Sequence, residues 1–436
     1  MNNLLFCKSF IYSILLSLQE YIYFFKGRLW LTLEFISFIG MFYSFITLHF
    51  ILVLIFCICF ILTLIIPTQT ITNPQLLVSP NEFTQKLSHC FSLKPFNSPI
   101  YLCDGIIQTI NVFATRFPIK LEFDREFING YDNGKFAVDW LSNQQTLSTN
   151  SPILLVYHGL AGGCRESYIQ RFVYYAQQKN YRIVVYTYRG CAGTKMTTPR
   201  AYNITCLEDS VTCINYIHSK YPTAPIITVG YSMGGMVSTT LCGRLDNLRE
   251  SCNLIGCVAI SATWPSLSTA NAIPQVFMDS FTKSLVKIAY KNQDIFLNAM
   301  KEHKIPSFDY HLMDYVTTVP QFDNNFDCKL FGFGHYETYY YDIEQWYHFL
   351  PKSSIPLLAI NSIDDPIAIM PSYTIQRVKN MVASSSNVIF ILTNNGGHLG
   401  WVDNSNKMSF VDEATLEYCD ELVKLFNSGN LISTAF

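Results

Sequence analysis

Residues 226–235 read Ile-Ile-Thr-Val-Gly-Tyr-Ser-Met-Gly-Gly, and this stretch decides the fold. It opens with a continuous apolar run, which is typical of a strand buried on both faces. Residues 230–234 then form Gly-x-Ser-x-Gly where that strand should end and a helix should begin. The glycines let Ser232 adopt a strained tight turn with its Oγ exposed above the sheet. The stretch therefore predicts a nucleophilic serine at a strand-to-helix junction.

Apolar strands alternate with helical segments on both sides of this stretch. Strands are expected at 153–157, 182–187, 254–261, 355–361 and 387–393, and helices around 168–177, around 207–218 and from 233. Runs of Val and Ile without alternation are buried on both faces, and strand–helix–strand order requires parallel pairing with right-handed crossovers. The core is therefore predicted to be α/β, with a mostly parallel central sheet flanked by helices.

Two segments do not follow this alternation of apolar strands and helices. Residues 119–128 and 135–140 alternate apolar and polar side chains on either side of Asp132-Asn133-Gly134, which predicts an antiparallel hairpin at the start of the sheet. Residues 264–350 are helical and rich in aromatic residues. An insertion at this place, before the last strands, is expected to form a helical lid over the carboxyl edge of the sheet.

A serine hydroxyl needs a general base, and the base needs an acid that orients it. His398 lies in a glycine-flanked loop after the last expected strand, on the same sheet edge as Ser232. Asp364 and Asp365 follow the preceding strand, which gives the chain order Ser, Asp, His. In related loops, the acid immediately precedes a short residue and then a hydrophobic one. Pro366-Ile367 fills these two positions after Asp365, so we favour Asp365, and Asp364 remains the alternative.

The charge on a tetrahedral intermediate needs donors that already point at it. The N–H of Met233, directly after the serine, is the expected first donor. The glycine-rich loop 158–163 follows the strand at 153–157, and the Leu160 N–H is the expected second donor. We interpret His158 as a structural residue of this loop.

The N-terminal third carries the strongest membrane signal. Residues 35–66 contain no Asp, Glu, Lys or Arg, and this run exceeds the roughly 20 residues that span a bilayer. We therefore expect a leader at 1–34, possibly with an interfacial helix, a transmembrane helix at 35–66, a linker at 67–92 and a folded domain at 93–430. A second crossing within the leader stays open.

The charges around this segment predict its orientation. Lys8, Lys26 and Arg28 precede the expected span, and no Lys or Arg follows it before Lys86. The positive-inside rule then puts the N-terminus in the cytosol and the rest of the chain in a lumen, in the endoplasmic reticulum or another endomembrane, or outside the cell. Asn203-Ile204-Thr205 is the only acceptable N-glycosylation sequon, and modification at Asn203 would accompany this topology.

Composition excludes other classes of function. Thirty Lys plus Arg against 32 Asp plus Glu, without a basic run, argues against nucleic-acid binding. The 14 cysteines include no Cys-x-x-Cys pair and no His at zinc-ligand spacing, so neither a metal nor another cofactor is expected. Membrane and a lipid substrate are the expected partners, and the oligomeric state is open.

Several motifs together resemble the membrane-anchored α/β-hydrolase-domain proteins of the AB hydrolase 4 family. They lie at 105–110, 138–140, 158–163 with 166–168, 188–193, 230–235, 321–323 with 332–333 and 339–340, 362–366 and 396–401. The family includes animal lipid hydrolases, yeast medium-chain ethyl-ester synthase/hydrolases and related bacterial esterases. The resemblance implies an α/β-hydrolase fold and a serine hydrolase of lipid or fatty esters, of the monoacylglycerol lipase, phospholipase or medium-chain esterase type. Acyl transfer through the same acyl-enzyme, and a lipid-binding protein without turnover, remain alternatives.

Overall fold

The structure is a computed structural model that describes residues 35–41, 55–58, 71–99, 102, 104–115, 119–402 and 408–431. The chain divides into two compact units, one made of 71–97 with 105–436 and the other of 1–70 with 98–104. The first unit holds the sheet and the candidate site, and it is the one described below.

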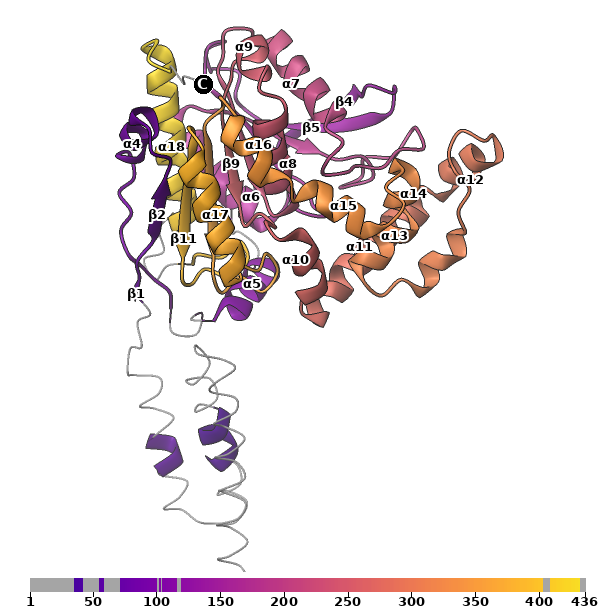
Figure 1. Cartoon of the computed structure of the whole chain (residues 1–436), viewed down its shortest axis with the longest axis horizontal. Coiled ribbons are helices and arrows are strands. Elements are labelled where there is room, and N and C mark those ends of the chain that lie inside the picture. Colours follow the sequence, from indigo (N-terminus) through magenta and orange to yellow (C-terminus); the bar gives the residue numbers. More distant parts are fainter. Residues whose placement is uncertain are drawn as a thin grey trace, which may run out of the picture. The chain divides into compact units, whose positions relative to one another are not determined.

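A nine-stranded sheet forms the centre of this unit (Figure 1). Its strands in chain order are β2 (Gln75–Val78), β4 (Phe123–Asn129), β5 (Lys135–Leu141), β6 (Ile153–Tyr157), β7 (Arg182–Thr187), β8 (Ile226–Tyr231), β9 (Leu254–Ile260), β10 (Leu357–Ser362) and β11 (Val388–Thr393). They lie in the order β2-β11-β10-β9-β8-β6-β7-β5-β4. The six strands from β11 to β7 are mutually parallel, whereas β2, β5 and β4 pair antiparallel. The predicted α/β class with a mostly parallel sheet is confirmed. A separate two-stranded sheet joins β1 (Ile71–Thr72) to β3 (Phe96–Asn97).

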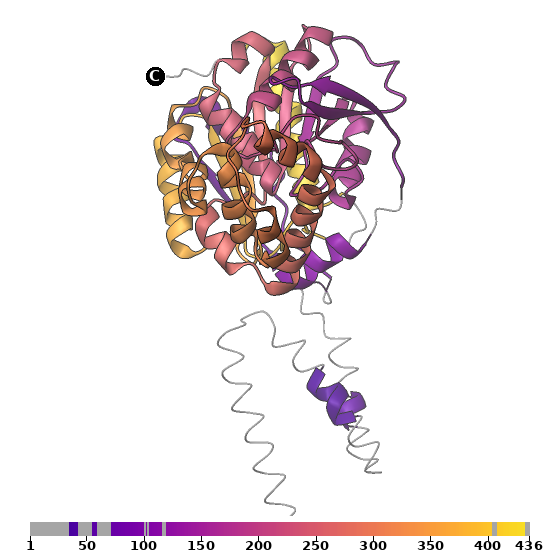
Figure 2. The same ribbon diagram turned by 90° about the vertical axis from the view of Figure 1, so that its right-hand side faces the viewer.

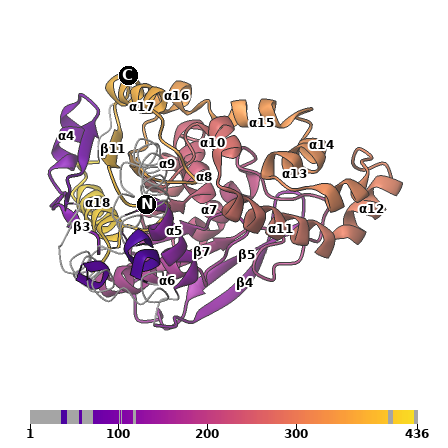
Figure 3. The same ribbon diagram turned by 90° about the horizontal axis from the view of Figure 1, so that it is seen from below.

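Helices cover both faces of the sheet, and its central strands are buried at every position. In β6, Ile153 and Leu155 belong to the core on one face, and Leu154 and Val156 belong to the core on the other. The first face packs against α7 (Glu208–Lys220), α8 (Met233–Arg244) and α17 (Ser372–Ser384). The second face packs against α4 (Glu82–Ser88), α5 (Gly105–Ala114), α6 (Ser167–Ala176) and α18 (Phe410–Asn427). Figure 3 shows α4 and β11 toward one edge of the sheet and β4 with β5 at the other.

The expected linker at 67–92 is wrong for the residues that the structure describes from 71 onward. β2 is an edge strand paired antiparallel with β11, and α4 follows it and contacts α18. β2 is difficult to recognise in the sequence because it has only four residues and its partner strand lies about 310 positions later in the chain. The folded domain therefore begins before the expected residue 93.

The expected hairpin forms, but its first strand is shorter than expected. β4 begins at Phe123 and not at 119, and its last pair with β5 joins Asn129 to Lys135. The Gly130 N–H donates to the Gly134 carbonyl, and Asp132 Oδ1 accepts from the Gly134 N–H, which closes the turn.

Residues 264–352, between β9 and β10, are helical. The helices are α10 (Ser266–Ala272), α11 (Gln275–Lys291), α12 (Gln293–Lys301), η3 (Tyr310–Tyr315), α13 (Val319–Asn325), α14 (Asp327–Phe331), α15 (Tyr336–Ile343), α16 (Trp346–Phe349) and η4 (Leu350–Lys352). We call this segment the lid; Figure 2 shows its helices gathered in front of the sheet. Part of it is anchored in the main core, where Trp346 donates a hydrogen bond to the Trp264 carbonyl. The remaining helices are η2 (Gln177–Lys179) and α9 (Leu248–Cys252).

The expected transmembrane helix at 35–66 falls mostly on residues outside the described ones. Only 35–41 and 55–58 of it are described, and both are helical. Across the described parts of the chain, no helix combines the length and apolar character that a membrane crossing requires.

Candidate active site

Ser232 sits between the last residue of β8 and the first residue of α8. Its backbone has a φ of 55°, in the left-handed region that side chains other than glycine rarely adopt. The turn is tight enough that a Cβ on Gly230 would lie 2.0 Å from the Gly234 carbonyl oxygen. A Cβ on Gly234 would lie 2.4 Å from the Tyr157 carbonyl oxygen on the neighbouring strand. Both glycines are therefore required for this turn to form.

His398 lies in the loop after β11, where the sequence predicts it. Its Nε2 is 2.9 Å from Ser232 Oγ, although 166 positions separate the two residues. The backbone is held as well, since the His398 N–H donates to Thr109 Oγ1 over 2.8 Å. The side chain is almost completely buried.

Of the two candidate acids, Asp365 is the one in contact with His398. Its Oδ2 lies 2.8 Å from His398 Nδ1, and its Oδ1 accepts from the Ile367 and Ala368 N–H groups over 2.8 and 2.7 Å. Asp364 points elsewhere, with Oδ1 accepting from the Gly397 N–H over 2.9 Å. Burial raises the pKa of Asp364 to about 6, while the bond from Gly397 lowers it. Asp364 therefore stabilises the loop that carries His398 and does not contact the imidazole.

The expected oxyanion donors lie beside Ser232. Leu160, Met233 and Ser232 line one cavity, and a Cβ on Gly159 would lie 3.5 Å from the Ser232 Cβ. Within the described chain, the N–H groups of Leu160 and Met233 donate to no backbone carbonyl. The Gly159 N–H, in contrast, donates to the Tyr168 hydroxyl over 3.0 Å, which fixes the loop.

His158 is buried behind the same loop. Its Nδ1 donates to the Gly159 carbonyl over 2.7 Å, and its ring stands edge-on to Tyr188. Burial lowers its pKa to about 4, so it is neutral at physiological pH. Neither contact involves Ser232.

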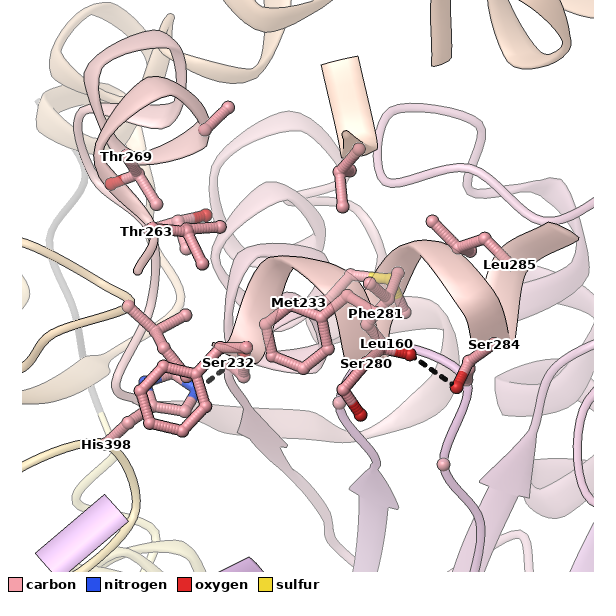
Figure 4. Close-up of a pocket in the computed structure, with 18 of the residues that line it drawn as sticks. Leu160, Ser232, Met233, Thr263, Thr269, Ser280, Phe281, Ser284, Leu285 and His398 are labelled. Carbon is pink, nitrogen blue, oxygen red and sulfur yellow. Dashed lines mark hydrogen bonds between the residues drawn. The ribbon is translucent and has the colours of Figure 1, made fainter. Parts of the chain in front are cut away.

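The cavity next to Ser232 has a volume of about 650 Å³ and extends under the lid (Figure 4). Its walls are mainly apolar, with Phe277, Phe281 and Leu285 of α11 among the lining side chains. Figure 4 shows His398 and Ser232 at one end of the labelled lining and Ser284 and Leu285 at the other.

The structure places the sequon residue Asn203 in the interior of the folded unit. The side chain is only 6% exposed, and its Oδ1 accepts from the Thr205 N–H and hydroxyl over 2.8 and 2.9 Å. Asn203 also lines the cavity described above. A sequon constrains only three neighbouring residues, so it carries no information about burial.

Three supporting residues were not assigned a role from the sequence. Thr109 and Tyr168 fix the backbones of His398 and Gly159, and Ser261 Oγ accepts from the Leu399 N–H over 3.3 Å. Thr109 and Tyr168 lie within the motifs that carry the family resemblance, which was the available signal. Ser261 gave none.

Comparisons with known proteins agree with this geometry. A family model described as "alpha/beta hydrolase fold" matches residues 152–405. Phospholipase ABHD3 from Homo sapiens is 27% identical over 369 residues, covering 81% of this chain and 85% of the relative. Monoacylglycerol lipase ABHD2 from Danio rerio is 26% identical over 308 residues, covering 68% and 72%. The resemblance predicted from the motifs is thereby confirmed, and the chain belongs to the α/β hydrolase fold family.

Proposed function

We propose that this carboxylic-ester hydrolase cleaves acyl esters of lipids, with Ser232 as nucleophile, His398 as general base and acid, and Asp365 as the acid that orients His398. The observation that carries the proposal is the unbroken chain of hydrogen bonds from Ser232 through His398 to Asp365 in the wall of an apolar cavity. The names of the relatives ABHD3 and ABHD2 support a lipid ester as substrate.

Each step of the reaction has a group in position. His398 Nε2 takes the proton of Ser232 as Oγ attacks the ester carbonyl, and Asp365 stabilises the imidazolium that forms. The N–H groups of Leu160 and Met233 bind the oxyanion of the tetrahedral intermediate. His398 then protonates the leaving alcohol, and water repeats the cycle on the acyl-enzyme. A binding protein without turnover would not need this alignment.

The cavity favours a substrate with an acyl chain. Burying each methylene contributes about 0.8 kcal/mol, whereas an unpaired polar group costs free energy in such a site. We therefore expect kcat/KM for glycerol esters to rise from acetyl to octanoyl. A series of monoacylglycerols measured with one enzyme preparation tests this trend, and the highest activity on the acetyl ester would contradict the lipid assignment.

The end of the cavity away from Ser232 should determine the preference for longer acyl chains. Leu285→Trp adds bulk there and is expected to lower kcat/KM for the octanoyl ester at least tenfold more than for the acetyl ester, because it shortens the space for the chain. Leu312→Trp is the matched control, since Leu312 is an exposed lid residue outside the cavity. Equal losses on both esters would show that the chain binds elsewhere.

We further propose that residues 35–66 anchor the enzyme in an endomembrane, such as the endoplasmic reticulum, with a cytosolic N-terminus. The uncharged run and the Lys/Arg bias before it support this proposal. In sealed microsomes, a C-terminal tag is expected to resist added protease and to be digested once detergent opens the vesicles. Digestion without detergent would contradict the single crossing or its orientation.

A further inference from the structure

A group of polar side chains on the lid lines the cavity and has no part in the reaction steps above. Asp323 on α13 and Asp327 at the start of α14 both line the cavity, and their carboxyl groups are close enough to interact electrostatically. The Tyr340 hydroxyl donates to Asp323 Oδ2. In the part of the chain that the structure describes, no Lys or Arg forms an ion pair with either carboxyl.

The two carboxyls do not both ionise near neutral pH. Burial raises the pKa of Asp323 to about 7 and raises that of Asp327 well above its usual value. Burial and the neighbouring carboxyl therefore favour at most one negative charge on the pair near neutral pH. Asp323 has lone pairs left after accepting from Tyr340.

A buried donor without a partner lines the same cavity. Asn203 is more than nine-tenths buried, and Thr205 occupies its Oδ1. Its Nδ2 has no hydrogen-bond partner among the residues described by the structure. An unpaired buried amide costs free energy unless a ligand supplies the missing acceptor.

Two adjacent tyrosines connect this donor to the carboxyl pair. Tyr339 accepts a hydrogen bond from the Ile204 N–H over 3.4 Å, one residue after Asn203. The ring of Tyr339 lies 5.5 Å from that of Tyr340, which binds Asp323. We call Asn203, Asp323, Asp327 and Tyr340 the lid polar cluster.

We propose that the lid polar cluster is a subsite for the hydroxyl groups on the alcohol portion of the ester, a proposal that rests on the proposed function. One hydroxyl can accept from Asn203 Nδ2, and another can donate to Asp323. A glycerol moiety carries such hydroxyls without charge. A phosphate would bring a second negative charge to the carboxyl pair, and a quaternary ammonium offers no acceptor for Asn203. The cluster therefore selects an uncharged glycerol ester.

Three esters with one acyl chain test this subsite: 1-octanoylglycerol, ethyl octanoate and 1-octanoylglycerophosphocholine. The full-length enzyme is expected to show at least tenfold higher kcat/KM for 1-octanoylglycerol than for the other two. Asn203→Asp retains the acceptor that Thr205 needs and removes the donor, so it should reduce the preference over ethyl octanoate at least fivefold. Asp323→Asn should also reduce it. Asn271→Asp, the same change at an exposed lid residue outside the cavity, should keep the wild-type preference.

The outcomes separate this proposal from the proposed function. Labelling of Ser232 by a fluorophosphonate shows that each variant retains a folded, reactive site. If both variants are labelled as the wild type is and keep its preference, the subsite is wrong while the hydrolase assignment stands. A preference for the phosphocholine ester that Asp323→Asn abolishes and Asn203→Asp retains would overturn the proposed hydroxyl subsite and indicate an ammonium group. Absence of labelling and of turnover on every ester in the wild type would instead overturn the proposed function.

Discussion

Ser232→Ala is expected to reduce ester turnover by about 10⁴-fold or more and to abolish fluorophosphonate labelling. The variant lacks the hydroxyl that contacts His398 Nε2, so no acyl-enzyme can form and only oxyanion binding and substrate positioning remain. The measurement is kcat on 1-octanoylglycerol together with probe labelling.

The fold should survive this change. Alanine adopts the same φ as serine here with no added steric cost, and the bond between His398 and Asp365 does not involve Ser232. The melting temperature is therefore expected to stay close to that of the wild type. Turnover within about tenfold of wild type in a folded variant would remove Ser232 from the mechanism.

Asp365→Asn is expected to lower kcat by about 10⁴-fold, because it forces the wrong imidazole tautomer. Asp365 Oδ1 accepts from two backbone N–H groups, so an asparagine must place its amide oxygen there. Its NH₂ group then faces His398 Nδ1, which has to act as an acceptor. The ring proton moves to Nε2, and His398 can no longer take the proton of Ser232.

Asp364→Asn is the matched comparison, since the same change is made one residue earlier. An asparagine there can still accept from the Gly397 N–H, and kcat should fall by less than about tenfold. Steady-state kinetics of both variants with octanoylglycerol decide between the two acids. A larger loss in Asp364→Asn would assign the orienting role to Asp364.

The sequence predicts the parts of the molecule that depend on local pattern. The buried strands from β6 to β11 each read as an apolar run, and the turns that follow them carry Ser232, Asp365 and His398. Because the carboxyl ends of parallel strands share one sheet edge, their proximity follows from topology. The choice between Asp364 and Asp365 could not be derived in this way, since it depends on which side chain the turn directs at His398.

The remaining features depend on contacts between distant residues. β2 is recognisable only through its pairing with β11, and the burial of Asn203 only through the lid packed over it. Likewise, Asp323 and Tyr340 meet across 17 positions on different lid helices, and neither position alone suggests a buried carboxyl pair. Local patterns report periodicity and turn chemistry, and they do not report which side chains converge after folding.

The pairing of β2 with β11 decides where the unit that holds the sheet can be separated from what precedes it. A chain that begins at residue 93 would lack both β2 and α4, so the Leu76, Leu77 and Val78 backbone would no longer cover β11. The uncovered groups of β11 would form an open hydrogen-bonding edge, which recruits strands from other molecules and promotes aggregation. Beginning the chain before Ile71 keeps that edge closed, and a monodisperse preparation is expected only from the longer form.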